Sequence, residues 1–294
     1  MFGFFASRVE RALNRTCVIT GATSGLGRAT ALALAGLGAD VMLVGRNQPL
    51  GEHVAQLCRR RNPGARAQFL RADLSSQTDV RALAAAIRRQ CERVDVLINN
   101  AGARYDTYDE SPEGIERTFA GNHIGHFLLT HLLLSHLELA KPGRVITIGS
   151  VAHLGADLTS GWVERCDGYN RRRAYANSKL ANIVFARELA ARNEPTQITS
   201  NAVDPGIVFS RFARNNGLKS WLTHVVAHAI RRELVSAAVG ADTIVYLATS
   251  EAGTAVTGRY FCKRAETSVS PLAADPGVGR QVWSLSLTLT GLRQ

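Results

Sequence analysis

CVITGATSGLG, residues 17–27, is the stretch that decides the fold of this chain. It opens with a short apolar run, Cys17 to Ile19, which is typical of a buried strand. Glycines follow at once, and a helical pattern runs from Ala29 to Leu37. A glycine-rich turn between a strand and a helix lets a pyrophosphate approach the backbone at the helix N-terminus. The stretch therefore predicts a phosphate-binding turn after the first strand.

Further short apolar runs recur along the chain, separated by segments with helical spacing such as Val80, Leu83, Ala84 and Ile87. This alternation predicts a parallel sheet covered on both faces. Right-handed crossovers then give an α/β fold, a Rossmann-type doubly wound parallel sheet of about seven strands flanked by helices in a single domain. The predicted strands after the first are 41–44, 67–70, 94–98, 145–148 and 198–203.

Composition fits one globular unit, because 294 residues with 46% hydrophobic side chains can bury a full core. The five cysteines are odd in number and scattered, which indicates neither a disulfide framework nor a zinc site and favours the cytoplasm. Residues 1–15 form a predicted N-terminal extension. Its apolar start, Met1 to Phe5, is too short for a transmembrane segment, so we expect an added packed helix or contact with a membrane surface.

The formal net charge of +11 raises nucleic acid as a partner. The basic residues are spread along the whole chain, so we expect no nucleic-acid binding. One tight run exists, Arg171 to Arg173, which is either a solvated face or a feature that attracts an anionic substrate or cofactor.

Tyr175 and Lys179 form the most informative pair of polar residues. Four residues apart in a helix, they share a face and project into one space. An adjacent cation favours the phenolate, so we expect Lys179 to lower the pKa of Tyr175 toward neutrality. Tyr175 is therefore a candidate general acid/base.

These features together resemble the short-chain dehydrogenase/reductase family over nearly the whole chain. Further motifs narrow the resemblance to the retinol dehydrogenase-like branch: 122–130, 150–153, 178–182 and 280–284. The motifs that carry the family resemblance are Thr20–Gly27, Asp73-Leu74, Asn99–Gly102, Asn122, Ser150, Tyr175, Lys179 and Pro205-Gly206.

The resemblance implies an enzyme, spanning residues 16–294, that transfers hydride between a nicotinamide cofactor and a carbonyl or alcohol substrate. Tyr175 would exchange the proton with the substrate oxygen, its pKa lowered by Lys179 together with the positive nicotinamide of the oxidised cofactor. Lys179 would hold the nicotinamide ribose, and Ser150 would hold the substrate oxygen as charge develops there. Asn122 would hold a water that relays protons to Lys179.

The cofactor is expected to be NADP rather than NAD. The second strand ends at Gly45-Arg46, where an acidic residue would favour the ribose of NAD and Arg46 can instead pair with a 2′-phosphate. Arg28 either adds a positive contact or faces solvent, and Asp40 stands at the wrong end of that strand. The other cofactor-binding residues that the resemblance implies are Gly21, Thr23, Ser24, Gly25, Leu26, Gly27, Asp73, Leu74, Asn100, Ala101, Gly102, Tyr175, Lys179, Pro205, Val208 and Ser210.

Two segments are expected to border the substrate. The first is the long insertion from about His153 to Arg173, with Trp162 and Tyr169, and the second is residues 209–232, a substrate lid. These aromatic walls suit an apolar substrate. The resemblance also implies a homodimer or tetramer that pairs through the helices containing Asn122 and Tyr175, with a monomer as the alternative.

Two other functions stay open at this point: a non-catalytic NADP-binding sensor or scaffold, and a membrane-surface retinal/retinol dehydrogenase. A metal site is not expected, because no carboxylate stands between His224 and His228 and the other clustered histidines fall on different faces of one helix. Those histidines are His123, His126, His131 and His136.

Overall fold

The computed structural model describes residues 15–159, 161–193, 197–208 and 234–293. The predicted extension at 1–15, apart from Arg15, lies outside the described residues. So do the predicted lid at 209–232, Ser210, and the histidines 224 and 228.

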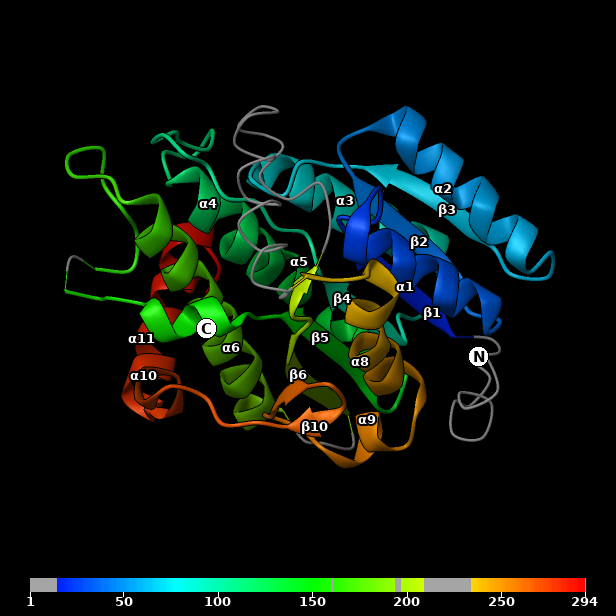
Figure 1. The fold of residues 1–294 in the computed structure, drawn as a ribbon. Coiled ribbons are helices and arrows are strands. Elements are labelled where there is room, and N and C mark those ends of the chain that lie inside the picture. Colours follow the sequence, from blue (N-terminus) through cyan, green and yellow to red (C-terminus); the bar gives the residue numbers. More distant parts are fainter. Residues whose placement is uncertain (1–14, 160, 194–196, 209–233, 294) are drawn as a thin grey trace.

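One eight-stranded sheet forms the centre of the molecule, in the order β10-β9-β6-β5-β4-β1-β2-β3 (Figure 1). All neighbours are parallel except the β9–β10 hairpin, which confirms the predicted doubly wound sheet. A separate parallel pair joins β7 (Ile207–Val208) to β8 (Leu234–Val235). The strands of the main sheet are β1 (Thr16–Thr20), β2 (Asp40–Gly45), β3 (Ala67–Arg71), β4 (Val96–Asn99), β5 (Gly143–Ile148), β6 (Ile198–Asp204), β9 (Tyr260–Cys262) and β10 (Ala265–Glu266).

Helices cover both faces of this sheet, and the helices and the sheet form a single packed unit (Figure 1). The described helices are α1 (Gly25–Gly36), α2 (Gln48–Arg61), α3 (Gln77–Gln90), α4 (Arg117–Phe119), the π-helix η1 (Ala120–Ile124), α5 (Gly125–Glu138), the 3-10 helix η2 (Val151–Gly155), α6 (Arg171–Arg192), α8 (Ala237–Thr249), α9 (Ala252–Ala255), α10 (Pro271–Ala274) and α11 (Pro276–Thr290). No helix within these described ranges is long and apolar enough to cross a membrane.

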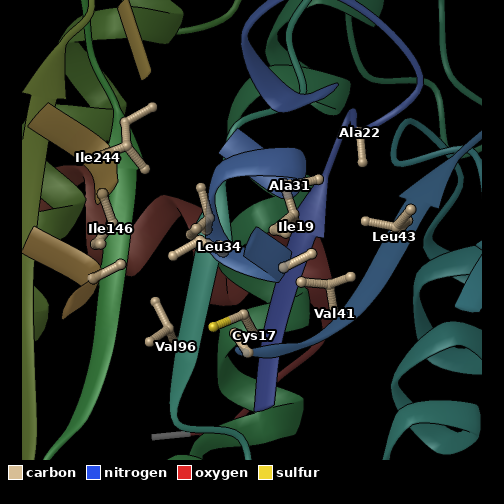
Figure 2. Close-up of a cluster of buried hydrophobic side chains, with 14 of the residues drawn as sticks. Cys17, Ile19, Ala22, Ala31, Leu34, Val41, Leu43, Val96, Ile146 and Ile244 are labelled. Carbon is tan, nitrogen blue, oxygen red and sulfur yellow. The ribbon is translucent and has the colours of Figure 1, made fainter. Parts of the chain in front are cut away.

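The alternation of side chains along β1 divides the core into two layers. Cys17 and Ile19 pack beneath Leu34 of α1 and Ile244 of α8, as Figure 2 shows. Val18 points to the opposite face, where α3, α5, α6 and α11 contribute to a second cluster. Because β1 is buried on both faces, its sequence is a continuous apolar run rather than an alternating one.

The C-terminal helix α11 closes the face on which the predicted dimer contact would lie. Its Val282 and Trp283 are buried against α5 and α6, and its Ser286 hydroxyl lies 2.8 Å from His123 Nε2. As a result α6 has no exposed residue from position 174 to 190, and the outer face of α11 is polar. These contacts favour the monomer, the alternative predicted from sequence, over pairing through the helices that hold Asn122 and Tyr175, because α11 covers apolar surface of α5 and α6.

We therefore expect the protein to sediment as a monomer of about 31.7 kDa at micromolar concentration. Trp283→Asp should expose the layer beneath α11 and lower stability by several kcal/mol, as burial of an unpaired charge does. Sedimentation velocity and thermal unfolding measure both effects. A stable wild-type dimer would contradict the expectation, whereas the exposed Gln281→Asp should change neither property.

Candidate active site

A cleft of about 980 Å³ opens where the strands of the sheet end. The strand order reverses between β1 and β4, and ligands of doubly wound folds bind at such a switch point. Every predicted catalytic or cofactor-binding residue within the described ranges lines this cleft, and only Ser210 lies outside the description. The fold thus brings the loops after β1 to β6 together in one place.

The glycine turn after β1 has the geometry of a phosphate cradle. Gly21 has φ +67°, and a Cβ at Gly27 would stand 2.4 Å from the carbonyl oxygen of Gly21. Residues with side chains are excluded from both positions for these two reasons. Helix α1 begins at Gly25, and its N-cap Ser24 makes no side-chain capping bond. The first N–H groups of α1 are therefore left to meet an anion in the cleft.

A buried hydrogen-bond network fixes this turn to the loop after β4. The backbone N–H groups of Asn100 and Ala101 donate to Thr20 Oγ1 at 2.8 and 3.0 Å, and His126 Nε2 lies 2.9 Å from that oxygen. His126 Nδ1 lies 2.9 Å from the carbonyl oxygen of Asn122, which can only accept. His126 therefore carries its proton on Nδ1, and burial lowers its pKa to about 4, so it is neutral. None of this was predicted from sequence.

The far end of the cleft carries the residues predicted to choose the cofactor. Arg46 follows Gly45 at the end of β2, and its Nη1 is 3.9 Å from Asp73 Oδ2 and 3.5 Å from the Tyr105 hydroxyl. Asp73 Oδ1 accepts from the backbone and side chain of Ser75. Arg28 is exposed and does not line the cleft, and Asp40 is ion-paired to Arg66 at the opposite end of β2.

Tyr175, which is half-buried, presents its phenol to the cleft from α6. Burial raises its pKa to about 12, while a hydrogen bond from Ser150 and the charge of Arg104 act in the lowering direction. Lys179 Nζ is 5.7 Å from the centre of the Tyr175 ring. Burial of the phenol thus outweighs the lowering of its pKa expected from Lys179, and the further lowering expected from a bound, positively charged nicotinamide stays a prediction. The spacing of four residues correctly predicted that Tyr175 and Lys179 lie close together. Desolvation of the phenol, however, has the largest effect on its pKa.

Lys179 is held by the backbone at the end of β5. Its Nζ donates to the carbonyl oxygen of Ile148 at 3.0 Å, and Asn182 Nδ2 donates to the same oxygen at 3.1 Å. Burial lowers the pKa of Lys179 to about 8, partly offset by the charge of Asp204. The charged form of Lys179 is therefore destabilised by burial, and its hydrogen bond to Ile148 fixes the orientation of the side chain.

Asn122 lies in the π-helical turn η1, a form of backbone that often marks functional positions. Its side-chain amide accepts from Ala103 N at 2.8 Å and donates to Ala103 O at 2.9 Å and Ser178 Oγ at 3.0 Å. A Cβ on Gly102 would be 3.6 Å from Asn122 Oδ1 and 3.7 Å from Lys179 Nζ. Both atoms thus border one small space, where the predicted relay would have to operate.

Ser150 is oriented by a histidine that the sequence did not single out for this task. His153 Nδ1 donates to the carbonyl oxygen of Ser150 at 2.8 Å, and its Nε2 accepts from the backbone N–H of Ser270 at 3.0 Å. Ser150 Oγ also accepts from Ala152 N at 3.2 Å, as the N-cap of η2. The hydroxyl is therefore fixed at the cleft by the turn that follows it.

The residues of the insertion that line the cleft are not the ones expected from the sequence. Trp162 packs against an interior cluster, and the Tyr169 hydroxyl donates to Tyr105 O at 2.9 Å, so neither lines the cleft. The insertion and α6 instead contribute Gly155 and Arg172, and the loop after β4 contributes Arg104. Arg172 belongs to the basic run noted in the sequence, whereas nothing in the sequence pointed to Arg104.

Comparison with known proteins identifies the family. Residues 15–220 match the family model for short chain dehydrogenase. Retinol dehydrogenase 14 of Homo sapiens is 38% identical over 294 residues, covering 95% of this chain and 87% of that protein. An uncharacterised protein from Mycobacterium paratuberculosis matches with a TM-score of 0.74 at 29% identity, over 97% of this chain and 96% of that one.

A second solved structure includes a cofactor in its title. It is the RhlG/NADP active-site complex of Pseudomonas aeruginosa, with a TM-score of 0.67 at 28% identity, over 85% of this chain and 94% of that one. The fold, the position of the cleft and the family model indicate the same family. The chain therefore belongs to the short-chain dehydrogenase/reductase family, in its retinol dehydrogenase-like branch, and is an NAD(P)-dependent oxidoreductase.

Proposed function

We propose that the protein is an NADPH-dependent ketone or aldehyde reductase in which Tyr175 donates the proton. One observation carries this proposal: the cleft brings together the Tyr175 phenol, the Ser150 hydroxyl and Lys179, whose Nζ is 5.7 Å from the centre of the Tyr175 ring. A phenol keeps its proton at neutral pH, which is the state that a proton donor to a carbonyl oxygen needs.

The chemistry divides among a few side chains. When bound, the nicotinamide cofactor would supply the hydride. Ser150, whose hydroxyl is fixed at the end of β5, would donate a hydrogen bond to the substrate oxygen, and Tyr175 would pass its proton to that oxygen. Lys179 would stabilise the negative charge left on the phenolate, and Asn122 would border the water that returns a proton.

We assign the preference for NADP over NAD to Arg46. The cleft presents Gly45 and Arg46 where NAD-binding folds commonly place a carboxylate, and a guanidinium can hold a 2′-phosphate through two hydrogen bonds. The NADP complex of the Pseudomonas aeruginosa relative supports the same choice. The first N–H groups of α1 and the glycine cradle would hold the pyrophosphate.

Arg46→Asp is expected to raise the dissociation constant for NADPH by about a hundredfold while the affinity for NADH increases, because a charge-assisted pair becomes a repulsion. Isothermal titration with each nucleotide measures the change. Arg71→Asp makes the same charge change at the end of the neighbouring strand, outside the cleft, and should leave the preference intact. Equal losses in both variants would show that only general charge matters.

Retinaldehyde is a second candidate substrate, favoured by the 38% identity to a retinol dehydrogenase. A non-catalytic NADP-binding role is the alternative from another class, and it predicts nucleotide binding without turnover of any carbonyl compound. Oxidation of NADPH, followed at 340 nm against aldehydes, ketones and retinaldehyde, separates the three. A cytoplasmic location stays a prediction.

A further inference from the structure

His126 is a fully buried polar residue that the proposed chemistry does not use. It lies in the first turn of α5 and does not itself line the cleft. Its Nε2 is 2.9 Å from the hydroxyl of Thr20, the residue directly before the glycine turn, and its Nδ1 is 2.9 Å from the carbonyl oxygen of Asn122. A buried imidazole bonded at both nitrogens is held in one orientation and can in turn position its partners.

The two partners of His126 hold opposite ends of one loop, residues 100–103, and all four of these residues line the cleft. Thr20 Oγ1 accepts from the first two backbone N–H groups of the loop at 2.8 and 3.0 Å. The side-chain amide of Asn122 bonds the backbone N–H and the carbonyl oxygen of Ala103 at 2.8 and 2.9 Å. His126 therefore connects the two anchors of the loop that runs from the glycine turn to the predicted relay.

The donors and acceptors of this network assign a different role to each nitrogen of His126. A hydroxyl has two lone pairs and one proton, and the loop N–H groups occupy the lone pairs of Thr20. Its proton is left for His126 Nε2 at 2.9 Å or the Ile98 carbonyl oxygen at 3.2 Å. The carbonyl oxygen of Asn122 can only accept, so Nδ1 carries the imidazole proton. Nδ1 thus donates toward the relay, and Nε2 accepts from the start of the glycine turn.

The bond from Nδ1 supports an unusual piece of backbone. Asn122 lies in the π-helical turn η1, where the N–H of Gly125 bonds the carbonyl oxygen of Ala120, five residues back rather than four. Such turns are rare, and surrounding contacts have to maintain them. The Nδ1–H of His126 supplies one such contact, at the residue whose amide borders the same small space as Lys179.

We propose that His126 is a positioning residue for two separate steps, nucleotide binding through Thr20 and proton return through Asn122. This rests on the proposed reductase function. Nε2 holds the hydroxyl that begins the turn proposed to bind the pyrophosphate. Nδ1 holds the backbone beside the space where the relay would operate. A histidine that only filled the core would affect the stability of the fold without separating these two steps.

Two amide variants separate the roles because their side chains differ in reach. The amide of His126→Asn stands near the position of Nδ1, so it can keep the bond to Asn122 while the bond to Thr20 is lost. The longer amide of His126→Gln reaches the position of Nε2, so it can keep the bond to Thr20 while the bond to Asn122 is lost.

The two variants should therefore have opposite effects. We expect His126→Asn to raise the dissociation constant for NADPH by about tenfold and to leave kcat within about twofold of wild type. His126→Gln should lower kcat by about tenfold and leave the dissociation constant within about twofold. The solvent deuterium isotope effect on kcat should rise in His126→Gln alone, because proton return becomes slow. Calorimetry with NADPH and steady-state reduction of a carbonyl compound measure these changes.

His131→Asn and His131→Gln are the matched controls. His131 lies on the same helix, and its Nδ1 is 3.0 Å from the carbonyl oxygen of Phe127, four residues back, as that of His126 is from Asn122. It does not line the cleft. Both controls should change thermal stability alone. The proposal is overturned if the two His126 variants change affinity and kcat in parallel, or if they change only stability.

Failure of the reductase function would be visible separately, as a wild type that binds NADPH and reduces no carbonyl compound. The NADPH affinities then decide the inference: a loss in His126→Asn alone supports the part through Thr20, and equal affinities reject it. Should the variants not fold, nitrogen-15 NMR of the wild type replaces them. The His126 ring should show the Nδ1–H tautomer at neutral pH, with both nitrogen resonances shifting when NADPH binds. The other tautomer, or resonances that NADPH leaves unchanged, would overturn the proposal.

Discussion

Tyr175→Phe is expected to lower kcat/KM for NADPH-dependent carbonyl reduction by about a thousandfold, the range that a positioned proton donor contributes. The change removes one oxygen from a half-buried side chain and leaves the ring in place. Because in the proposed mechanism the phenol would touch the substrate rather than the phosphates of the cofactor, NADPH affinity should stay within about twofold. Stopped-flow absorbance at 340 nm and NADPH titration measure the two effects.

Two controls separate this role from a structural one. Tyr108→Phe removes a hydroxyl that donates to Glu110 and does not line the cleft, and it should be fully active. Ser150→Ala removes the hydrogen bond to the phenol and should lose activity by a smaller factor. Full turnover by Tyr175→Phe would reject the mechanism, whatever the nucleotide affinity.

The central sheet and the cofactor end of the cleft could be predicted because their determinants are local. The run from Cys17 to Ile19 is apolar on both faces, and Gly21 and Gly27 are required by a backbone angle and a close approach. Such constraints act within a few residues and leave a readable pattern. The order of strands then follows from right-handed crossovers, which place the remaining loops at one edge.

The rest of the site depends on contacts between distant segments. Arg104 lines the cleft beside Asp106, which is ion-paired with Arg171 of α6, and His153 bonds Ser150 while accepting from Ser270, more than a hundred positions away. Tyr169 was predicted to border the substrate because it is an aromatic residue of the insertion. Its hydroxyl instead donates to the carbonyl oxygen of Tyr105. The cover that α11 gives to α6 could not be predicted for a similar reason, because nothing local shows that α11 folds back over α6.

Lys179→Met is expected to inactivate the enzyme by about a thousandfold or more and, in contrast to most core substitutions, to stabilise the folded protein at pH 7. Burial lowers the pKa of Lys179 from 10.5 to about 8, so the folded state carries a destabilising charge at neutral pH. That drop corresponds to about 3 kcal/mol. Loss of the hydrogen bond to Ile148 offsets about 1 kcal/mol, which leaves a net gain of about 2 kcal/mol.

The pH dependence gives this gain a distinctive sign. Between pH 8 and 10.5 the unfolded chain binds the proton of Lys179 more strongly than the folded protein does, so wild-type stability rises with pH in this window. The advantage of the methionine variant is therefore full below pH 8 and fades toward pH 10.5. Urea unfolding at pH 7 and pH 10 measures it, and Lys263→Met, at an exposed lysine, should show no such difference. The expectation would be contradicted by a Lys179→Met variant less stable than wild type at pH 7, or by a stability difference that does not change with pH. Either result would mean that the charge of Lys179 does not destabilise the folded protein. A gain that shrinks with pH would show that the fold gives up stability to hold a cation beside Tyr175, as catalytic sites commonly do.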